Sequence, residues 1–230
     1  MRTLALLFIA LAMSVPIVAA QQAWCGQQTL YFQNNVSPDI AGYEQLINYP
    51  SGGSQIDENI TITNVNGWVL IDTYIIEKES FQHTNELLKG LRRYRTYHYV
   101  SSASGTTLIN FTAFKRYANG TEANFYSALT DDINSLVPDE YLTSYVSQVD
   151  VPIEYGDTLG IKVYGKTTHS SPITLHWLYQ GTSNVSHFES GYFVCEEEDT
   201  SNAGAAGIVF GLVGGLIGSI LVYRRLGGKE

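Results

Sequence analysis

The sequence predicts an all-β extracellular domain, folded as an antiparallel β-sandwich, that is followed by a single transmembrane helix. Two observations predict the sandwich: several segments alternate apolar and polar residues with period two, and turn-forming residues separate these segments. A third observation predicts the helix, because residues 203–222 contain no charged side chain and are rich in Gly, Ile, Val and Leu.

The N-terminus has the pattern of a secretory signal peptide. Arg2 precedes an apolar block at residues 4–13, and small residues at 18–20 precede Gln21. Small residues at these positions are typical of a cleavage site. We therefore expect residues 1–20 to be a signal peptide, with a buried N-terminal strand or helix as the alternative.

Alternation is clearest in three interior segments. Residues 69–76 predict a strand that is largely apolar on both faces, whereas 159–164 and 173–180 alternate regularly. Asn119-Gly120 lies between two further apolar segments and predicts a tight hairpin, because both residue types tolerate positive φ. Such segments together predict roughly eight to ten strands.

Two segments interrupt the strand pattern. Residues 77–95 contain Asn-Glu-Leu-Leu-Lys at 85–89, so we expect a loop with one helical turn at most, and then a strand. Residues 131–139 contain Pro138 and predict a second loop. The sandwich is thus expected to occupy residues 21–195.

The C-terminal part predicts a membrane anchor. We expect the polar, acidic segment 196–202 to be a stalk. The roughly 20 apolar residues at 203–222 suffice to cross a bilayer once. The tail, 223–230, carries Arg224 and Arg225, and such basic residues stay in the cytoplasm. We expect a single-pass protein of a cell membrane or viral envelope, with its N-terminus outside. The alternative is a temporary sorting signal that is removed when the protein is attached to a wall or lipid anchor.

Glycines in the expected helix are spaced to allow two helices to pack closely. Glycine has no Cβ, so a face of glycines four residues apart permits close backbone approach. We expect self-association through this face, although small residues are common in membrane helices for other reasons. The glycines are Gly207, Gly211, Gly214, Gly215 and Gly218.

The two cysteines, Cys25 and Cys195, lie near opposite ends of the expected sandwich. In an oxidising compartment an isolated pair predicts a disulfide, and neither cysteine has the spacing of a metal site. Five Asn-x-Ser/Thr sequons are compatible with a glycosylated exterior, although chance alone would supply a few in a chain rich in these residues. They begin at Asn35, Asn59, Asn110, Asn119 and Asn184.

Charge and missing motifs exclude several functions. A net charge of −9 disfavours nucleic acid as a partner, because phosphate binding needs clustered Lys and Arg. The signatures of serine hydrolases, zinc proteases and nucleotide-binding proteins are missing, so we predict no cofactor and no enzymatic activity. A two-histidine metal site at His98 and His176 is a weaker hypothesis, because no third ligand is defined.

Paired carboxylates leave a carbohydrate-active hydrolase as the least supported hypothesis. Two of them would have to converge in a cleft, which sequence alone does not establish. The alternative for these residues is solvated surface charge or incidental calcium binding. The candidates are Asp131, Asp132, Asp139, Glu140, Asp150, Glu154 and Asp157.

Tyrosine is abundant, with 16 residues, and exposed tyrosines can stack on sugars or anchor protein interfaces. Four of them are candidates for a ligand-binding face: Tyr94, Tyr97, Tyr99 and Tyr179. The alternative is cross-strand packing, in which aromatic pairs stabilise the sheet itself.

Several short segments resemble jelly-roll modules of phage and other virus structural proteins and of related microbial surface proteins. They include Leu30-Tyr31-Phe32, the run Ser37 to Tyr43, Phe114-Lys115-Arg116, Asp157-Thr158-Leu159 and Lys162-Val163-Tyr164. The resemblance covers most of residues 28–190. It implies a jelly-roll-like two-sheet sandwich used for assembly or receptor contact, with no catalytic residues to transfer.

Together these features predict a non-enzymatic, membrane-anchored adhesion module that presents a β-sandwich to a glycan or a surface protein. A structural envelope, virion or surface-coat component that assembles laterally is the alternative. Both predictions depend on the anchor and on the missing catalytic motifs.

Overall fold

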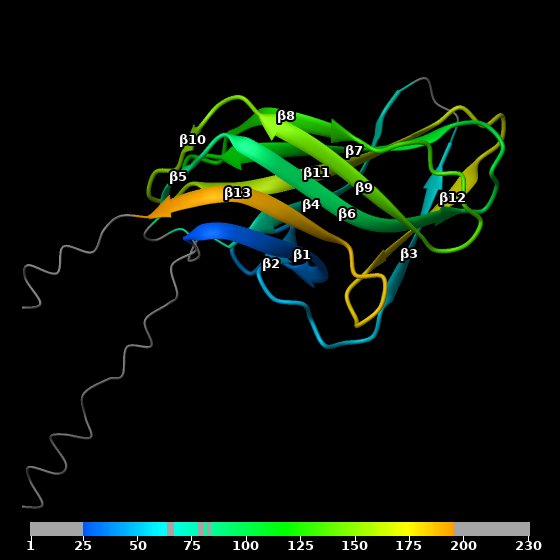
Figure 1. The fold of residues 1–230 in the computed structure, drawn as a ribbon, viewed down its shortest axis with the longest axis horizontal. Helices are drawn as coiled ribbons and strands as arrows, with labels where there is room; N and C mark the ends of the chain where they lie inside the picture. Colours follow the sequence, from blue (N-terminus) through cyan, green and yellow to red (C-terminus); the bar gives the residue numbers. More distant parts are fainter. Residues whose placement is uncertain (1–24, 64–66, 78–80, 82–83, 196–230) are drawn as a thin grey trace, which may run out of the picture. The chain divides into compact units, whose positions relative to one another are not determined.

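The computed structural model describes residues 25–63, 67–77, 81 and 84–195, and these form an all-β unit (Figure 1). The expected signal peptide, stalk, membrane helix and tail lie outside the described residues. The strands are β1 (Gly26–Val36), β2 (Glu44–Ile47), β3 (Ile56–Ile62), β4 (Val69–Ile76), β5 (Thr84–Leu87), β6 (Gly90–Val100), β7 (Thr107–Arg116), β8 (Glu122–Leu129), β9 (Asp139–Ser147), β10 (Val151–Pro152), β11 (Thr158–Thr167), β12 (Ile173–Tyr179) and β13 (His187–Cys195).

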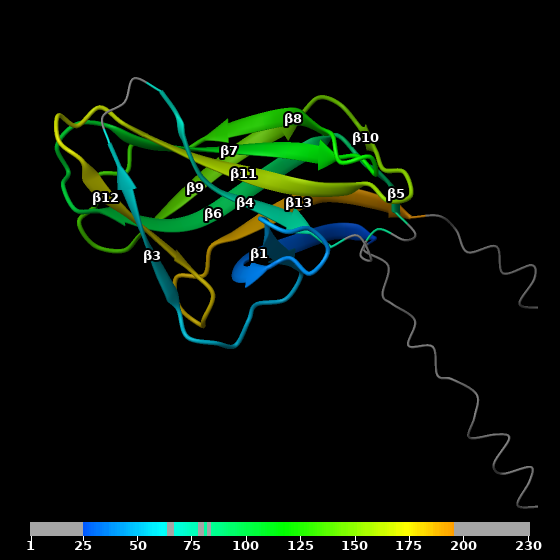
Figure 2. The same ribbon diagram turned by 180° about the vertical axis from the view of Figure 1, so that it is seen from behind.

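The strands follow one hydrogen-bonded path in the order β3-β12-β6-β13-β1-β2-β4-β11-β7-β8. Three further strands join beside it: β9 pairs with β6, while β5 pairs with β13 and β10. Figures 1 and 2, seen from opposite sides, show β6, β9 and β13 on one side of the unit and β7, β8 and β11 on the other. The path therefore curls so that its two halves face each other.

Aromatic side chains fill the space between the two halves. Tyr94 of β6 stacks on Phe111 of β7, with ring centroids 4.4 Å apart, and on Phe188 of β13 at 4.6 Å. Trp177 of β12 is fully buried and meets the edge of Tyr74 of β4 at 5.6 Å. Each such contact adds to the burial of large apolar rings, which is the main stabilising effect in a core of this kind.

The expectation of a purely antiparallel sandwich is wrong in one place, because β2 and β4 pair in parallel. Parallel neighbours need a crossover connection, and here β3 provides it. The chain leaves β2, forms β3 at the far end of the hydrogen-bonded path, and returns to lie beside β2 as β4. The described sheet is therefore mixed.

The interrupted segments differ partly from expectation. Residues 84–87 form the short strand β5 and not a helical turn, because they pair with β13 and with β10. Short strands such as this one raise the total among the described residues to thirteen, above the expected eight to ten. The loop at 131–138 and the Asn119-Gly120 hairpin are confirmed, and Gly120 has a φ of +89°.

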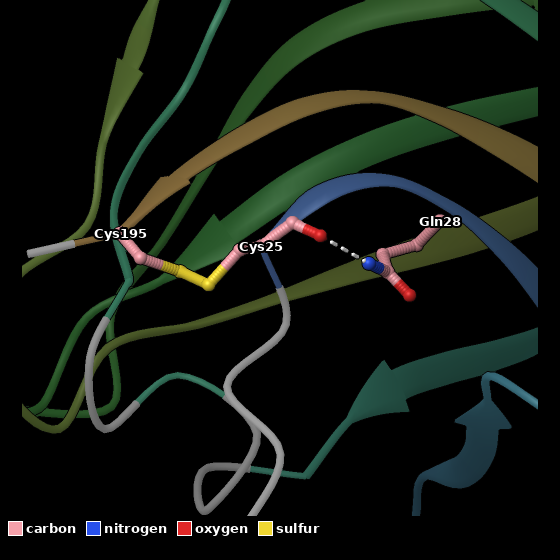
Figure 3. The surroundings of a disulfide bond; sticks show 3 residues. All are labelled: Cys25, Gln28 and Cys195. Carbon is pink, nitrogen blue, oxygen red and sulfur yellow. Dashed lines mark hydrogen bonds between the residues drawn. A yellow bond between two sulfur atoms is a disulfide. The ribbon is translucent and has the colours of Figure 1, made fainter.

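A disulfide joins the start of β1 to the end of β13, as the sequence predicts. Cys25 directly precedes β1 and Cys195 is the last residue of β13, and their Cα atoms lie 5.5 Å apart (Figure 3). The Gln28 side-chain amide donates a hydrogen bond to the Cys25 carbonyl at 2.8 Å. The cross-link thus fixes both ends of the described unit to each other.

The membrane expectation is not tested by the described residues. No helix among them is long and apolar enough to cross a bilayer. The expected span at 203–222, with its five glycines, lies outside them.

Candidate functional site

Three carboxylates from three strands meet where the crossover brings β3 against β2 and β4. Glu44 stands opposite Tyr74 in the parallel β2–β4 pair, and Asp72 lies two residues before Tyr74 on the same face of β4. Glu58 comes from β3, where the Tyr179 hydroxyl of β12 donates a hydrogen bond to its Oε2 at 3.1 Å. We call Glu44, Glu58, Asp72, Tyr74 and Tyr179 the acid–tyrosine cluster.

The strand pattern explains why these side chains face one another. Even-numbered residues of β3 turn inward, which places Glu58 in line with the buried Ile62. Tyr74 and Tyr179 belong to the aromatic core, with 0% and 1% of their surfaces exposed. The three carboxylates are half-buried, so the cluster joins the core to the protein surface.

The cluster lacks a compensating positive charge. Within the described residues, none of its three carboxylates forms an ion pair with Lys, Arg or His. Glu44 Oε2 and the Tyr74 hydroxyl are shielded from water, and neither makes a hydrogen bond of regular geometry. Buried polar groups are normally satisfied, so this unmet capacity is a notable feature of the cluster, which it shares with a few other buried groups such as Gln33 and His98.

Burial holds protons on these carboxyl groups, and the negative charge of Asp72 adds to this effect at Glu44 and Glu58. Burial, with the negative charge of Asp72 as the next cause, raises the pKa of Glu44 to about 8. Burial likewise raises the pKa of Asp72 and that of Glu58 above their usual range. Because Glu44 and Asp72 interact strongly, they bind protons as a pair. At neutral pH, such a pair can hold one proton between two carboxylates.

This arrangement permits acid–base chemistry. A protonated carboxyl can donate a proton while its ionised neighbour accepts one, which is the division of roles seen in paired catalytic carboxylates. In the part of the chain that the structure describes, no three His, Cys, Asp or Glu side chains are arranged to hold a metal ion. The His98 and His176 hypothesis fails because these two side chains lie on opposite faces: His98 is fully buried, whereas His176 stacks on the outward-facing Tyr99.

The carboxylates that the sequence singled out do not converge. Asp157 is buried and forms an ion pair with Lys115, with 2.6 Å between Oδ2 and Nζ. Glu140 pairs with Arg95 on the outer face of β6, and Asp150 accepts a hydrogen bond from the Lys89 backbone. The carbohydrate-hydrolase hypothesis built on these residues therefore finds no shared site among them.

The four candidate tyrosines do not share one surface. Tyr94 and Tyr179 are buried, whereas Tyr97 and Tyr99 lie on the outer face of β6. Among the sequons, Asn35, Asn59 and Asn119 are exposed, and their glycosylation stays a prediction.

Sequence reasoning missed the acid–tyrosine cluster, although one signal was present. Asp72 interrupts the apolar strand Val-Leu-Ile-Asp-Thr-Tyr-Ile-Ile, where a carboxylate is unusual. Glu44 and Glu58 gave no comparable signal, because each stands among polar neighbours in its strand.

No family model matches the chain, and no curated protein matches its sequence. Among solved structures, an aminopeptidase from the marine sediment archaeon Thaumarchaeota archaeon is similar, with a TM-score of 0.53 and 10% identity over 71% of this chain and 36% of that one. An α-amino acid ester hydrolase has a TM-score of 0.51 and 11% identity over 73% of this chain and 36% of that one. The chain thus spans little more than a third of the length of these enzymes.

Virus structures are also similar, but only distantly. The structure of infectious bursal disease virus has a TM-score of 0.32, and that of a human norovirus particle has 0.29. Values this low carry no argument for the virus-related assembly role that the sequence resemblance implied.

These comparisons correct the function that the sequence predicted. We expected a non-enzymatic adhesion module, yet two of the similar structures, with TM-scores of 0.53 and 0.51, are both hydrolases. At 10–11% identity they establish the fold alone. The prediction rested on missing motifs, and residues that a fold brings together from separate strands leave no such motif.

Proposed function

We propose that the protein is a hydrolase in which Glu44 and Asp72 are the proton-transferring pair. The observation that carries the proposal is the meeting of three half-buried carboxylates that form no ion pair with any described residue. The shared fold with an aminopeptidase and an α-amino acid ester hydrolase supports it, and points to amide or ester bonds as the substrate class.

The chemistry needs only water and the two carboxyl groups. The ionised member of the pair removes a proton from water, and the resulting hydroxide oxygen bonds to the carbonyl carbon. The protonated member gives its proton to the leaving nitrogen or oxygen as the bond to carbon breaks. The products are a carboxylic acid and an amine or alcohol, and the pair again holds one proton.

Tyr74 and Glu58 would act as positioning residues in this scheme. The Tyr74 hydroxyl lies beside Glu44 and Asp72, and its interactions lower the pKa of both, which opposes the effect of burial. Glu58 is held by the Tyr179 hydroxyl and adds negative charge beside Glu44. Burial and the charges of Asp72 and Glu58 outweigh the effect of Tyr74 at Glu44, so the pair keeps a proton at pH values where an exposed glutamate has lost it.

The decisive experiment measures hydrolysis of chromogenic aminoacyl anilides and aminoacyl esters by the full chain. We expect Glu44→Gln and Asp72→Asn each to reduce kcat/KM by at least about a hundredfold, since each removes one proton-transfer step. Glu154→Gln is the matched control, because it changes an exposed carboxylate far from the cluster in sequence. The absence of hydrolysis, or equal activity in all three variants, would contradict the proposal.

We also propose that this hydrolase works outside the cell, at a membrane. The signal-like residues 1–20, the apolar residues 203–222 and the disulfide support this location. Self-association through the glycine-spaced face is part of the same proposal. Protease accessibility of the intact cell surface tests the location, and crosslinking of a Gly211→Ile, Gly215→Ile variant tests the association.

A further inference from the structure

An open groove of about 490 Å³ lies on the outer face of the sheet, away from the core that the acid–tyrosine cluster borders. Its floor contains a row of cross-strand neighbours, in which Tyr31 of β1 stands opposite His187 of β13, and His187 opposite Arg95 of β6. The Tyr31 and His187 rings lie 5.5 Å apart. The loops at 50–52 and 181–185 form its walls. A volume of this size is typical of small-molecule sites.

Glu140 stands beside the groove and accepts a hydrogen bond from the Tyr97 hydroxyl at 2.8 Å, but the groove lining itself has one permanent cation and no anion. Arg95 lines it and no Asp or Glu does, although the whole chain carries a net charge of −9. Glu140 lies 3.6 Å from Arg95 Nε, which is longer than the roughly 2.7–2.9 Å of a strong charge-assisted hydrogen bond. Arg95 therefore keeps donor capacity for a ligand anion.

Polar groups at the groove have hydrogen-bonding capacity that the described protein does not use. The Ser51 hydroxyl lines the groove, is shielded from water and has no hydrogen-bond partner among the described residues. His187 Nδ1 lies 3.0 Å from the Val185 carbonyl, which can only accept, so the neutral ring carries its proton there. The other ring nitrogen, Nε2, is then left as an acceptor for a ligand.

One wall of the groove is held in a restricted backbone conformation. Gln180 and Asn184 have φ values of 61° and 50°, and they are the only non-glycine residues with positive φ in the described part of the chain. Gly181 lies between them at +75°, where a Cβ would come within 2.8 Å of the Gln55 backbone nitrogen. The Gln55 side chain also donates to the Asn184 carbonyl at 3.3 Å. Such conformations cost free energy and cluster at binding sites, so this wall is preorganised.

We propose that this groove binds a monocarboxylate with an aromatic body, its carboxylate on Arg95 and its ring against Tyr31 and Tyr97. A guanidinium matches a carboxylate with two parallel hydrogen bonds. Arg95 is the one permanently charged side chain among the lining residues, which balances a monoanion and leaves a phosphate dianion undercompensated. Tyr31, Tyr97 and Pro50 supply the apolar surface for the ring.

The test is calorimetric titration of the full chain with N-acetyltyrosine and with N-acetyltyrosinamide. The two probes differ only in the group that Arg95 would hold, because the amide replaces one carboxylate oxygen by NH₂ and removes the negative charge. We expect the carboxylate to bind at least about tenfold more tightly, which is the scale of one charge-assisted hydrogen bond. Equal affinity of the two probes, no binding of N-acetyltyrosine at about 10 mM, or tighter binding of phenyl phosphate would overturn the proposal.

Arg93 provides a matched control. It lies two residues before Arg95 on the same face of β6, outside the groove lining, and is similarly exposed, at 49% against 46%. It also has a comparable partner, Glu189 at 3.5 Å. We expect Arg95→Gln to weaken N-acetyltyrosine binding about tenfold or more, and Arg93→Gln to change it less than twofold. Equal losses of affinity in both variants would show that overall surface charge is responsible, and would contradict binding in the groove.

Discussion

Two regions of this protein place carboxylates away from water, and they do so in opposite ways. Asp157 is 3% exposed and is fully compensated: it pairs with Lys115 at 2.6 Å and accepts backbone hydrogen bonds from Ala118 at 3.1 Å and Glu154 at 3.0 Å. The Lys115 ammonium also donates to the Pro152 carbonyl at 2.7 Å. The acid–tyrosine cluster half-buries three carboxylates, and none of them pairs with a cation among the described residues. Compensation stabilises the ionised form of a buried carboxylate, whereas burial without compensation favours the protonated form.

The pKa shifts express the same difference. Burial alone would raise the pKa of Asp157, but the hydrogen bonds from Lys115 and from the backbone amides outweigh it, and the pKa is lowered. Burial raises the pKa of Glu44 to about 8, because the neighbouring Asp72 repels the ionised form and does not stabilise it. Folding therefore favours the ionised form of Asp157 and the protonated form of Glu44.

The largest effect is expected from breaking the compensated region. Lys115→Met would leave the Asp157 carboxylate buried without its cation, and such changes typically cost about 3–5 kcal/mol. Urea denaturation at neutral pH measures the loss in free energy of unfolding. The double variant Lys115→Met, Asp157→Asn removes the stranded charge and is expected to recover part of the loss. If it recovers nothing, lost packing around Lys115 and not charge would be the cause.

A smaller effect of opposite sign is expected in the acid–tyrosine cluster. The folded state raises the pKa of Glu44 from its usual range to about 8, so the stability that this group contributes is full below about pH 4.5 and is lost as the pH rises through 8. Glu44→Gln mimics the protonated form. We expect it to be more stable than the parent protein by about 1–2 kcal/mol at pH 9, after allowance for solvent screening of a half-buried group, and equal to it below about pH 4.5.

Denaturation of both proteins across this pH range checks the prediction. A Glu44→Gln variant that is less stable at pH 9 would mean that the ionised glutamate has a compensating partner. The Asp157 region should behave in the reverse sense, because its lowered pKa makes the contribution full at neutral pH and lost under acid.

The comparison also explains what could be predicted from the sequence. Period-two alternation and the Asn119-Gly120 turn identify most strands, because both are local properties of the chain. Alternation predicts the face of each residue but not which strands become neighbours. Glu44 and Glu58 meet only because the chain crosses to the far end of the path between β2 and β4. The sequence therefore led to clustered carboxylates such as Glu154 and Asp157, and not to those that the fold assembles.

The disulfide and the groove show the same limit. Cys25 and Cys195 could be paired from the sequence because no other cysteine competes. Arg95 and His187 could not be recognised as neighbours from the sequence, because they are brought together by the register between β6 and β13. Local chemistry can be predicted when the partner is unique, whereas sites built across strands need the topology.

The smallest effect is expected at a partly exposed ion pair. It tests whether solvent exposure, and not the distance between the charges, determines how much an ion pair stabilises the protein. Lys162 and Glu122 lie 2.7 Å apart, almost as close as Lys115 and Asp157, but both side chains are about one fifth exposed, at 21% and 20%. Solvent weakens such pairs, so we expect Lys162→Met to cost only about 0.5–1 kcal/mol. This cost should shrink further in about 1 M salt, where the screening length falls to about 3 Å, while the cost of Lys115→Met should persist. Equal costs for the two substitutions would mean that the short contact itself provides the stability, and that burial does not distinguish the compensated region after all.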